Sequence, residues 1–421
     1  MFKLFNAIDY ICIDLANCVG TQGSFRGDKE LFEDRIQWVK DNFAVLEDFI
    51  DLAEDKPLYI KALYALRESV RGNPIGHLIA LDAACSGIQI MSAITGCVRG
   101  ADATGLISEK RADAYTDVTK EMNSILQLKG FSQIVVPRND VKRAVMTSGY
   151  GSTMVPKEVF GEGDLLATFY QAAFTIAPAA FELMADLLET WQVDTLAHNW
   201  VMPDNFHVNI KVMQTKETRI EVDELGHTTF TTYVKVNQGS KKGLANVANT
   251  IHSIDGYLLR SVIRRASFDV VKMRQAFNGI NAELTKRLNG STSEAEPLSA
   301  DLQNMLAIYE YSQMLDVSIV EYIDCQQIGN VPTELLGKLS NTIGKMLELG
   351  SSPVLTVHDA FRAHANHCNT VRYHYKEIMA ELAESNILQF IVSQITKQNV
   401  KYVKKSKDLA SKIRASNYAI C

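Results

Sequence analysis

The sequence predicts an α+β fold that is mostly helical and contains a small antiparallel sheet. Helical periodicity dominates the chain, and short β-type segments interrupt it without the regular alternation of strand and helix that a doubly wound sheet requires. With 421 residues, 47% of them hydrophobic and 22% charged, the chain is long enough for a large core and for roughly two or three domains.

Helices are predicted where apolar residues recur every three or four positions. The expected helical segments are much of 1–75, including 34–55, then 101–130, 137–150, 163–191, 252–277 and parts of 301–349. Pro137 supports the helix that follows it, because proline is favoured in the first turn. The polar segment 289–301 is expected to be a loop.

Strands are predicted where short apolar or alternating segments end in turn residues. They are expected at 77–81, in four segments between 198 and 237, and at 352–361, with a hairpin tip at 225–227. The first of these strands ends at Asp82 and the last contains Asp359 close to its end.

The bulk composition limits the classes of protein that fit. The formal net charge of −6 argues mildly against nucleic-acid binding, but a net value averages over the surface and allows a local basic groove. The seven cysteines form no Cys-x-x-Cys pair, which indicates free thiols in a reducing compartment. Neither a signal peptide nor a run of ~18 apolar residues is present, so no membrane partner is expected.

Asp82 and Asp359 are the first candidate site residues. They lie far apart in the sequence and can meet only if their strands pair in one sheet. If they do, they can hold two divalent cations about 4 Å apart, the arrangement used for nucleotidyl transfer. Mg²⁺ needs only one or two carboxylates beside substrate phosphates. Taken singly, each residue is more simply a surface or turn aspartate.

The segment 137–150 carries the second candidate group. Four residues recur at intervals of four along one helix face: Arg138, Lys142, Met146 and Tyr150. Two cations followed by an aromatic ring suit a nucleoside triphosphate, with the cations toward the phosphates and the ring toward the sugar and base. The plainer alternative is a solvated basic helix with a core tyrosine.

Taken together and in this order, these segments resemble the conserved motifs of single-subunit DNA-directed RNA polymerases of the bacteriophage and mitochondrial type. Asp82-Ala-Ala-Cys85-Ser86-Gly87-Ile88-Gln89 is similar to the family's Asp-Gly-Ser-Cys-Ser-Gly-Ile-Gln. The helix motif is matched by Arg138, Lys142, Arg143, Val145, Met146, Thr147, Tyr150 and Gly151, and the family's His-Asp strand end by His358 and Asp359. Further similar segments are 200–206, 249–256 and the C-terminal 416–421.

The resemblance implies a two-metal mechanism with two Mg²⁺ ions. Asp82 and Asp359 are implied to bind the ions, with the Ala83 carbonyl as an extra ligand. The RNA 3′-hydroxyl then attacks the α-phosphate of the incoming nucleotide in line. His358 is implied to support the primer end beside Asp359.

The resemblance also implies the residues that bind substrate, which are Arg138, Lys142, Arg143, Tyr150 and His252. Arg138 and Lys142 are implied to hold the triphosphate, and Lys142 to protonate the leaving pyrophosphate. Tyr150 and His252 are implied to sense the ribose 2′-hydroxyl, because a site built to hydrogen-bond a hydroxyl rejects the analogue that lacks it.

The implied architecture is a right-hand polymerase palm and fingers. The expected divisions are 1–105 (first part of the palm), 106–256 (fingers, with a specificity-type hairpin at about 206–237), 257–345 (a palm helix and an inserted helical subdomain) and 346–421 (second part of the palm and C-terminal tail). The hairpin lies where the family carries its promoter-reading loop, although a plain edge hairpin is equally compatible.

Three departures from the family pattern are visible. Ala83 replaces a glycine, an unusually long stretch separates His252 from Asp359, and the chain is far shorter than a whole enzyme of this type. Because Met1 resembles a natural start, we expect the larger subunit of a split, heterodimeric phage enzyme, with a second subunit supplying the N-terminal domain and thumb. A minimal single-chain enzyme is the alternative.

The expected partners are a DNA template, nascent RNA, NTPs and an accessory DNA-binding protein, in the cytoplasm of the phage's host cell. Two rival functions stay open. One is a related right-hand DNA polymerase, whose usual Asp-Tyr-Ser and His-Asp-Glu motifs differ from those here. The other is a non-catalytic subunit that binds nucleic acid.

Overall fold

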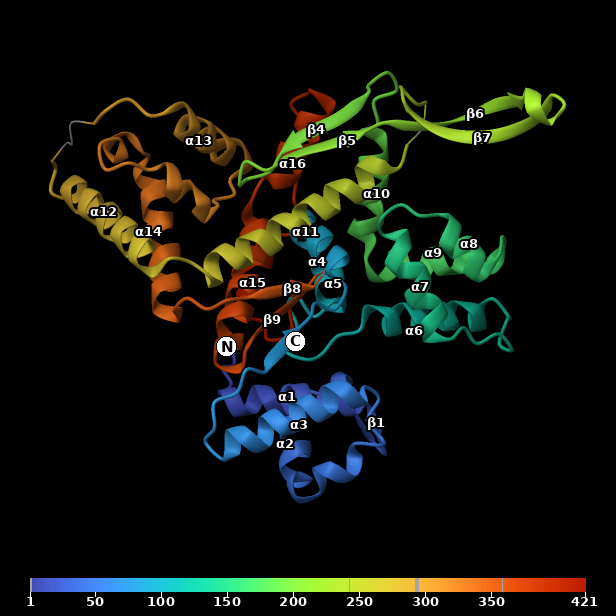
Figure 1. Cartoon of the computed structure of the whole chain (residues 1–421), viewed down its shortest axis with the longest axis horizontal. Helices are drawn as coiled ribbons and strands as arrows, with labels where there is room; N and C mark the ends of the chain where they lie inside the picture. The colour runs from blue at the N-terminus through green and yellow to red at the C-terminus, as the bar shows by residue number, and fades with distance from the viewer. Residues whose placement is uncertain (1, 242, 292–294, 358) are drawn as a thin grey trace.

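The computed structural model describes residues 2–241, 243–291, 295–357 and 359–421. These residues form many helices and four small antiparallel sheets, which confirms the predicted α+β class. Figure 1 shows a central body built around α4, α11, α15 and a short sheet, with helical lobes below and on both sides and one long hairpin projecting away.

The bounds of the elements are as follows. The helices are α1 (Ala7–Val19), α2 (Phe32–Asp41), α3 (Lys56–Val70), α4 (Ser86–Thr95), α5 (Val98–Ala103), α6 (Ala114–Leu128), α7 (Arg138–Ser148), α8 (Met154–Phe160), α9 (Asp164–Ile176), α10 (Pro178–Glu189), α11 (Ala245–Ala266), α12 (Val270–Leu288), α13 (Ala300–Ser312), α14 (Thr333–Leu349), α15 (Cys368–Glu384), α16 (Ile387–Thr396) and α17 (Leu409–Ala415). The strands are β1 (Thr21–Gln22), β2 (Phe25–Arg26), β3 (Leu78–Leu81), β4 (Ala197–Val201), β5 (His207–Lys211), β6 (Met213–Val222), β7 (Thr228–Asn237), β8 (Leu355–Val357) and β9 (Ala360–His364).

The central sheet has the strand order β3-β9-β8 and is antiparallel throughout. Leu81 pairs with Phe361, so the strands that lead to the two candidate aspartates do lie in one sheet, as expected. The prediction of one strand over 352–361 is wrong, because the chain reverses between β8 and β9 and Asp359 lies at that reversal. No glycine or proline marks the turn, so the apolar run gave no sign of it.

Helix α4 lies at the centre of the main core. All ten of its residues are buried, since α5, α10, α11 and α15 contact it on different sides. Its buried residues include the polar Gln89 and Ser92 as well as apolar residues such as Ile90 and Ile94. Its first residue, Ser86, follows Asp82 by one short turn, so the core fixes the position of that aspartate.

Three predicted helices end earlier than expected. The helix expected over 34–55 ends at Asp41, where a bent 3₁₀ segment begins. The helix over 163–191 breaks before Pro178, because proline disfavours a helical conformation in the residue before it. The helix over 252–277 stops at Ala266 and α12 starts anew, with the Asp269 side chain accepting from the first backbone N–H groups of α12.

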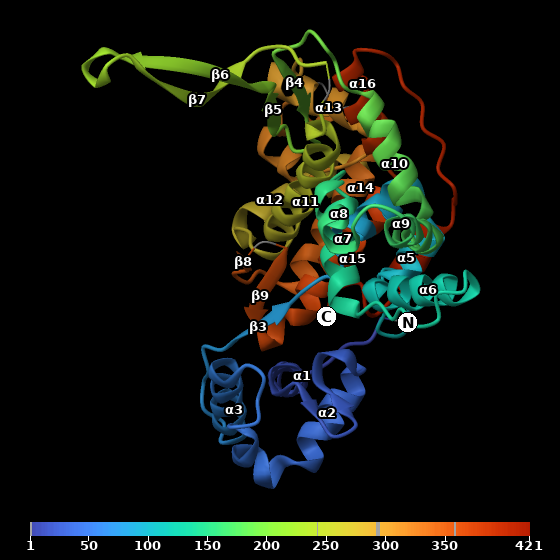
Figure 2. The same cartoon turned by 90° about the vertical axis from the view of Figure 1, so that its right-hand side faces the viewer.

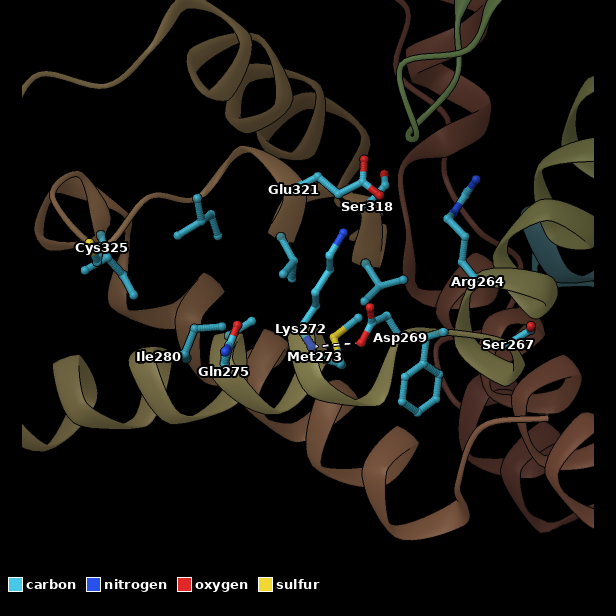
Figure 3. Close-up of a pocket in the computed structure, with 17 residues that line it drawn as sticks. Arg264, Ser267, Asp269, Lys272, Met273, Gln275, Ile280, Ser318, Glu321 and Cys325 are labelled. Carbon is cyan, nitrogen blue, oxygen red and sulfur yellow. Dashed lines mark hydrogen bonds between the residues drawn. The ribbon is translucent and has the colours of Figure 1, made fainter. Parts of the chain in front are cut away.

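Helices α12 to α14 enclose a second, smaller hydrophobic core that includes Ile280, Leu335 and Leu339. A cavity of about 580 Å³ lies between the start of α12 and the segment 317–328. Figure 3 shows Lys272 pointing from α12 into this cavity, with Glu321 on the opposite wall. This lobe falls within the part of the chain that the sequence predicts to be an inserted helical subdomain.

Strands β6 and β7 form a hairpin of ten paired positions, from Met213↔Asn237 to Val222↔Thr228. Figures 1 and 2 show it projecting from the body in both views. Gly226 has a φ of 67° at the tip, which confirms the predicted turn at 225–227. Within the described part of the chain, no helix is both long and apolar enough to cross a membrane.

Candidate active site

One cavity of about 360 Å³ collects most of the candidate residues. Asp82 enters it from the end of β3 and Asp359 from the reversal between β8 and β9. Helix α7 contributes the whole face named from the sequence, namely Arg138, Lys142, Met146 and, just beyond its end, Tyr150. Two strand-end carboxylates and a cationic helix face therefore share one space, although they come from distant parts of the sequence.

The two aspartates influence each other electrostatically. Burial raises the pKa of Asp82, and the negative charge of Asp359 raises that pKa further. Ser86 donates a hydrogen bond from Oγ to the Asp359 carboxylate at 3.2 Å. Two hard oxygen donors of like charge, partly removed from water, are a suitable donor set for a divalent cation, because the cation relieves their repulsion.

The loop from Asp82 to Ser86 supplies a third oxygen donor. The Ala83 carbonyl accepts a hydrogen bond from the Cys85 N–H at 2.9 Å, and a carbonyl oxygen has a second lone pair for another partner. Cys85 has a left-handed φ of 75°, while Ala83 does not. Alanine in place of the family's glycine therefore introduces no left-handed strain at Ala83.

Arg138 is held by residues that the sequence reading did not single out. Its guanidinium lies 2.7 Å from the Asp113 carboxylate and 5.5 Å from the centre of the Tyr115 ring. Burial alone raises the pKa of Asp113, but the Thr116 hydrogen bonds and the charge of Arg138 outweigh it and hold the pKa below its ordinary value. The ammonium of Lys142 lies 5.8 Å from the same ring. No ion pair of Lys142 is found among the described residues.

Tyr150 lies beside His252, with ring centres 4.8 Å apart. Burial raises the pKa of the Tyr150 hydroxyl, which therefore stays protonated and able to donate at neutral pH. Gly87 makes room for this ring, because a Cβ added there would lie 2.9 Å from Tyr150 Cζ. His252 itself is exposed and does not line the cavity.

Two candidate residues are not brought to the cavity. Arg143 points to another side of α7 and pairs with Glu158 at 3.0 Å on the surface. Its predicted contact with substrate has no support in this geometry, because consecutive residues of a helix face different directions. His358 lies outside the described residues, so its predicted role stays a prediction.

Other cavity residues escaped the sequence reading. Arg111 and Asp113 line the site just before α6, and Tyr115 lines it from the first turn of α6. Helical periodicity does not show which side chains at the start of a helix face a site. Asp255 lies outside this cavity, in the segment 249–256 that resembles a family motif, and burial and the charge of Asp359 raise its pKa to about 6.

The C-terminal segment also reaches the site. The Asp82 N–H donates to the Cys421 carbonyl at 3.2 Å, and the Cys421 N–H donates to the Asp82 carbonyl at 3.0 Å. This reciprocal pair resembles one rung of an antiparallel ladder. The end of the C-terminal segment 416–421, which resembles a family motif, therefore lies against the backbone of Asp82.

The fold and the cavity define a class of site that suits a nucleoside triphosphate and divalent cations. Residues 5–160 match the family model of DNA-dependent RNA polymerase. The chain is 30% identical over 154 residues to a probable DNA-directed RNA polymerase of Gelasinospora sp. (strain G114), a match that covers 33% of this chain and 18% of that protein. It is 26% identical over 337 residues to the T7 RNA polymerase of Escherichia phage T7, covering 59% of this chain and 38% of that protein.

These matches confirm the resemblance stated from the motifs. Residues 5–160 are similar to the DNA-dependent RNA polymerase family, and this stretch includes Asp82, Arg138, Lys142 and Tyr150. The chain spans well under half the length of either relative.

Proposed function

We propose that this chain catalyses template-directed RNA synthesis on DNA, adding nucleotides from NTPs to an RNA 3′ end. The observation that carries the proposal is the shared cavity of Asp82, Asp359, Arg138 and Lys142. The family match over residues 5–160 supports the same activity.

Mg²⁺ fits the oxygen donors of this cavity. Asp82 and Asp359 would hold two ions, with the Ala83 carbonyl as a further ligand. In this cavity bound Mg²⁺ would supply activation of the attacking 3′-hydroxyl and stabilisation of the negative charge on the leaving pyrophosphate. Ser86 orients the Asp359 carboxylate through its hydrogen bond.

Helix α7 binds the triphosphate. Arg138, fixed between Asp113 and Tyr115, presents its guanidinium to the phosphate oxygens. Lys142 contributes a second cation, which forms no ion pair among the described residues, and it donates a proton to the leaving pyrophosphate.

Tyr150 and His252 select the sugar. The Tyr150 hydroxyl hydrogen-bonds the ribose 2′-hydroxyl, and the ring of His252 holds Tyr150 in place. A deoxynucleotide lacks the hydroxyl that this group would hydrogen-bond, which is the physical basis of discrimination. His358 supports the primer end, a role that rests on the sequence motif alone.

The DNA template and the nascent RNA are the nucleic-acid partners. The residue divisions expected for palm, fingers and inserted subdomain, and the promoter-reading role of the hairpin at 206–237, are parts of the same proposal. A second subunit that supplies the N-terminal domain and thumb, an accessory DNA-binding protein and a location in the host cytoplasm stay predictions.

A related right-hand DNA polymerase is the second candidate. It is disfavoured by the Tyr150–His252 pair, which suits recognition of a 2′-hydroxyl. A comparison of ribonucleotide and deoxyribonucleotide incorporation on one primed template separates the two functions.

The proposal is tested by primed RNA extension. Asp359→Asn removes a metal-binding charge at similar size and is expected to abolish extension while leaving the circular-dichroism spectrum unchanged. Asp301→Asn, at an exposed position of α13, is the matched control and should extend like the wild type. Equal extension by Asp359→Asn and the wild type would refute the metal assignment.

A further inference from the structure

The side-chain amide of Gln89 joins three distant segments behind the candidate metal site. Gln89 is fully buried on α4. Its Nε2 donates to the Thr104 carbonyl at 2.8 Å and to the Ala419 carbonyl at 2.9 Å. Its Oε1 accepts from the Tyr375 hydroxyl at 2.7 Å. Both amide hydrogens and the amide oxygen are thus engaged, so the side chain has one defined orientation.

One of these bonds leads to Asp82. Ala419, held by Gln89, lies two residues before Cys421, whose backbone exchanges a pair of hydrogen bonds with Asp82. Arg111, which lines the active-site cavity, contacts Cys421 through its side chain. A displacement of the chain at Ala419 would therefore be transmitted to the backbone that carries the first carboxylate.

Another bond leads to Asp359. Tyr375 is buried on α15, and its ring packs edge-on against Phe361 with ring centres 5.9 Å apart. Phe361 lies two residues after Asp359 on β9 and pairs with Leu81 of β3. The Tyr375–Gln89 hydrogen bond thus connects the support of one carboxylate to the support of the other.

We propose that Gln89 and Tyr375 are positioning residues that set the spacing of Asp82 and Asp359, and with it the affinity for divalent cations. This inference rests on the proposed function, because the spacing affects activity only in a metal-dependent enzyme. Neither residue lines the cavity, so both act through the backbone segments that they hold.

A purely space-filling role for Gln89 would not explain why this buried side chain is polar. An apolar side chain would fill the position of Gln89 without needing partners, whereas a buried amide is tolerated only when it is hydrogen-bonded. The hydrogen bonds of Gln89 and Tyr375 therefore fix the orientation of the segments that they join. Supporting partners of metal ligands are known to affect metal affinity by about 10–100-fold.

The test compares Tyr375→Phe and Gln89→Met with Tyr59→Phe. Tyr59 is an equally buried tyrosine in the N-terminal helices, and its hydroxyl donates to the Leu46 carbonyl at 2.8 Å, so its variant loses a similar bond far from the site. Primed extension is measured against Mg²⁺ concentration, and Mn²⁺ binding is followed by electron paramagnetic resonance as a readout independent of activity.

For Tyr375→Phe we expect the Mg²⁺ concentration of half-maximal activity and the Mn²⁺ dissociation constant to rise about tenfold or more. The KM for NTP should stay within about twofold, and the loss of thermal stability should match that of Tyr59→Phe. Gln89→Met, which removes three bonds, should show the same change with a larger amplitude.

The positioning role would be overturned if either variant, when folded, bound Mn²⁺ as tightly as the wild type and showed the same dependence on Mg²⁺ concentration. So would an equal change in Tyr59→Phe, since that result would indicate a general effect of lost stability. Failure of the proposed function is recognised separately, as absence of RNA synthesis by the wild-type chain. In that case the Mn²⁺ measurements still decide whether Gln89 and Tyr375 control the spacing of the carboxylates.

Discussion

The ion pair between Arg138 and Asp113 offers a sharp test of triphosphate binding, because Asp113→Asn removes the charge and retains other functions of the side chain. Asp113 also accepts hydrogen bonds from the backbone N–H groups of Tyr115 and Thr116 at the start of α6. Asparagine is about as good as aspartate at this capping position, so α6 should stay folded. The substitution therefore isolates the contact that orients Arg138.

The expected free-energy contribution of the Arg138–Asp113 ion pair follows from how far the two side chains are exposed to solvent. A hydrogen bond to a charged group contributes roughly 1.5–3 kcal/mol. The Arg138 and Asp113 side chains are 33% and 24% exposed, so solvent screening reduces the expected contribution to about 1 kcal/mol. Since about 1.4 kcal/mol is a tenfold change in affinity, the KM for NTP should rise about fivefold. The kcat should change less, because Arg138 contacts the triphosphate before and during the reaction.

The assay is steady-state primed extension at varied NTP concentration. Asp269→Asn is the matched control, because Asp269 caps α12 in the same way but lies outside the active-site cavity. It should leave the KM unchanged. A KM for Asp113→Asn equal to that of the control would refute the view that Asp113 prepares Arg138 for the triphosphate.

Three further predictions concern selection of the sugar by Tyr150, the pKa of Asp255 and the stability of the lobe formed by α12 to α14. Tyr150→Phe keeps the ring beside His252 but removes the hydroxyl, so discrimination against deoxynucleotides should fall by about tenfold or more; unchanged selectivity would remove Tyr150 from sugar sensing. Asp255 has a folded-state pKa of about 6, above the ordinary 3.8, so its contribution to stability is present at low pH and is lost as the pH rises through about 6. Urea unfolding in EDTA should therefore give Asp255→Asn a higher free energy of unfolding than the wild type at pH 8, by at most about 3 kcal/mol. At pH 4 this difference should be absent. Equal stability of the two proteins at pH 8 would contradict the prediction. Leu339→Ala in the second core should lower the free energy of unfolding of this lobe by about 2–5 kcal/mol. Hydrogen exchange should then show faster exchange that is confined to α12–α14. Faster exchange throughout the molecule would show that this lobe is not an independent unit.

The sequence predicted those parts of the site that lie within single elements. The spacing of Arg138, Lys142 and Tyr150 placed them on one face because a helix repeats every 3.6 residues. Asp82 was found because a buried strand ends directly before it. Both signals are local, and both are present in the structure.

The rest depended on contacts between distant segments. The reversal at Asp359 and the break at Ser267 carry no glycine or proline, so hydrophobic periodicity ran through both. Asp113 and Tyr115 became visible as partners of Arg138 only when α6 and α7 were placed side by side. Gln89 belongs to a recognised motif, but its connection to Tyr375 spans much of the chain and has no local signature.

Asp82 and Asp359 are proposed to hold the divalent cations of nucleotidyl transfer. Iron-mediated cleavage can locate these cations, because Fe²⁺ in a Mg²⁺ site generates hydroxyl radicals that cut the nearby backbone. The exposed Glu221–Asp223–His227 group, whose ligand atoms lie within 4.8 Å of one another, is an internal comparison. We predict cuts near Asp82 and Asp359 that Mg²⁺ suppresses and that Asp359→Asn abolishes. Cuts confined to the hairpin, or cuts that persist in Asp359→Asn, would show that Asp82 and Asp359 do not hold the cations.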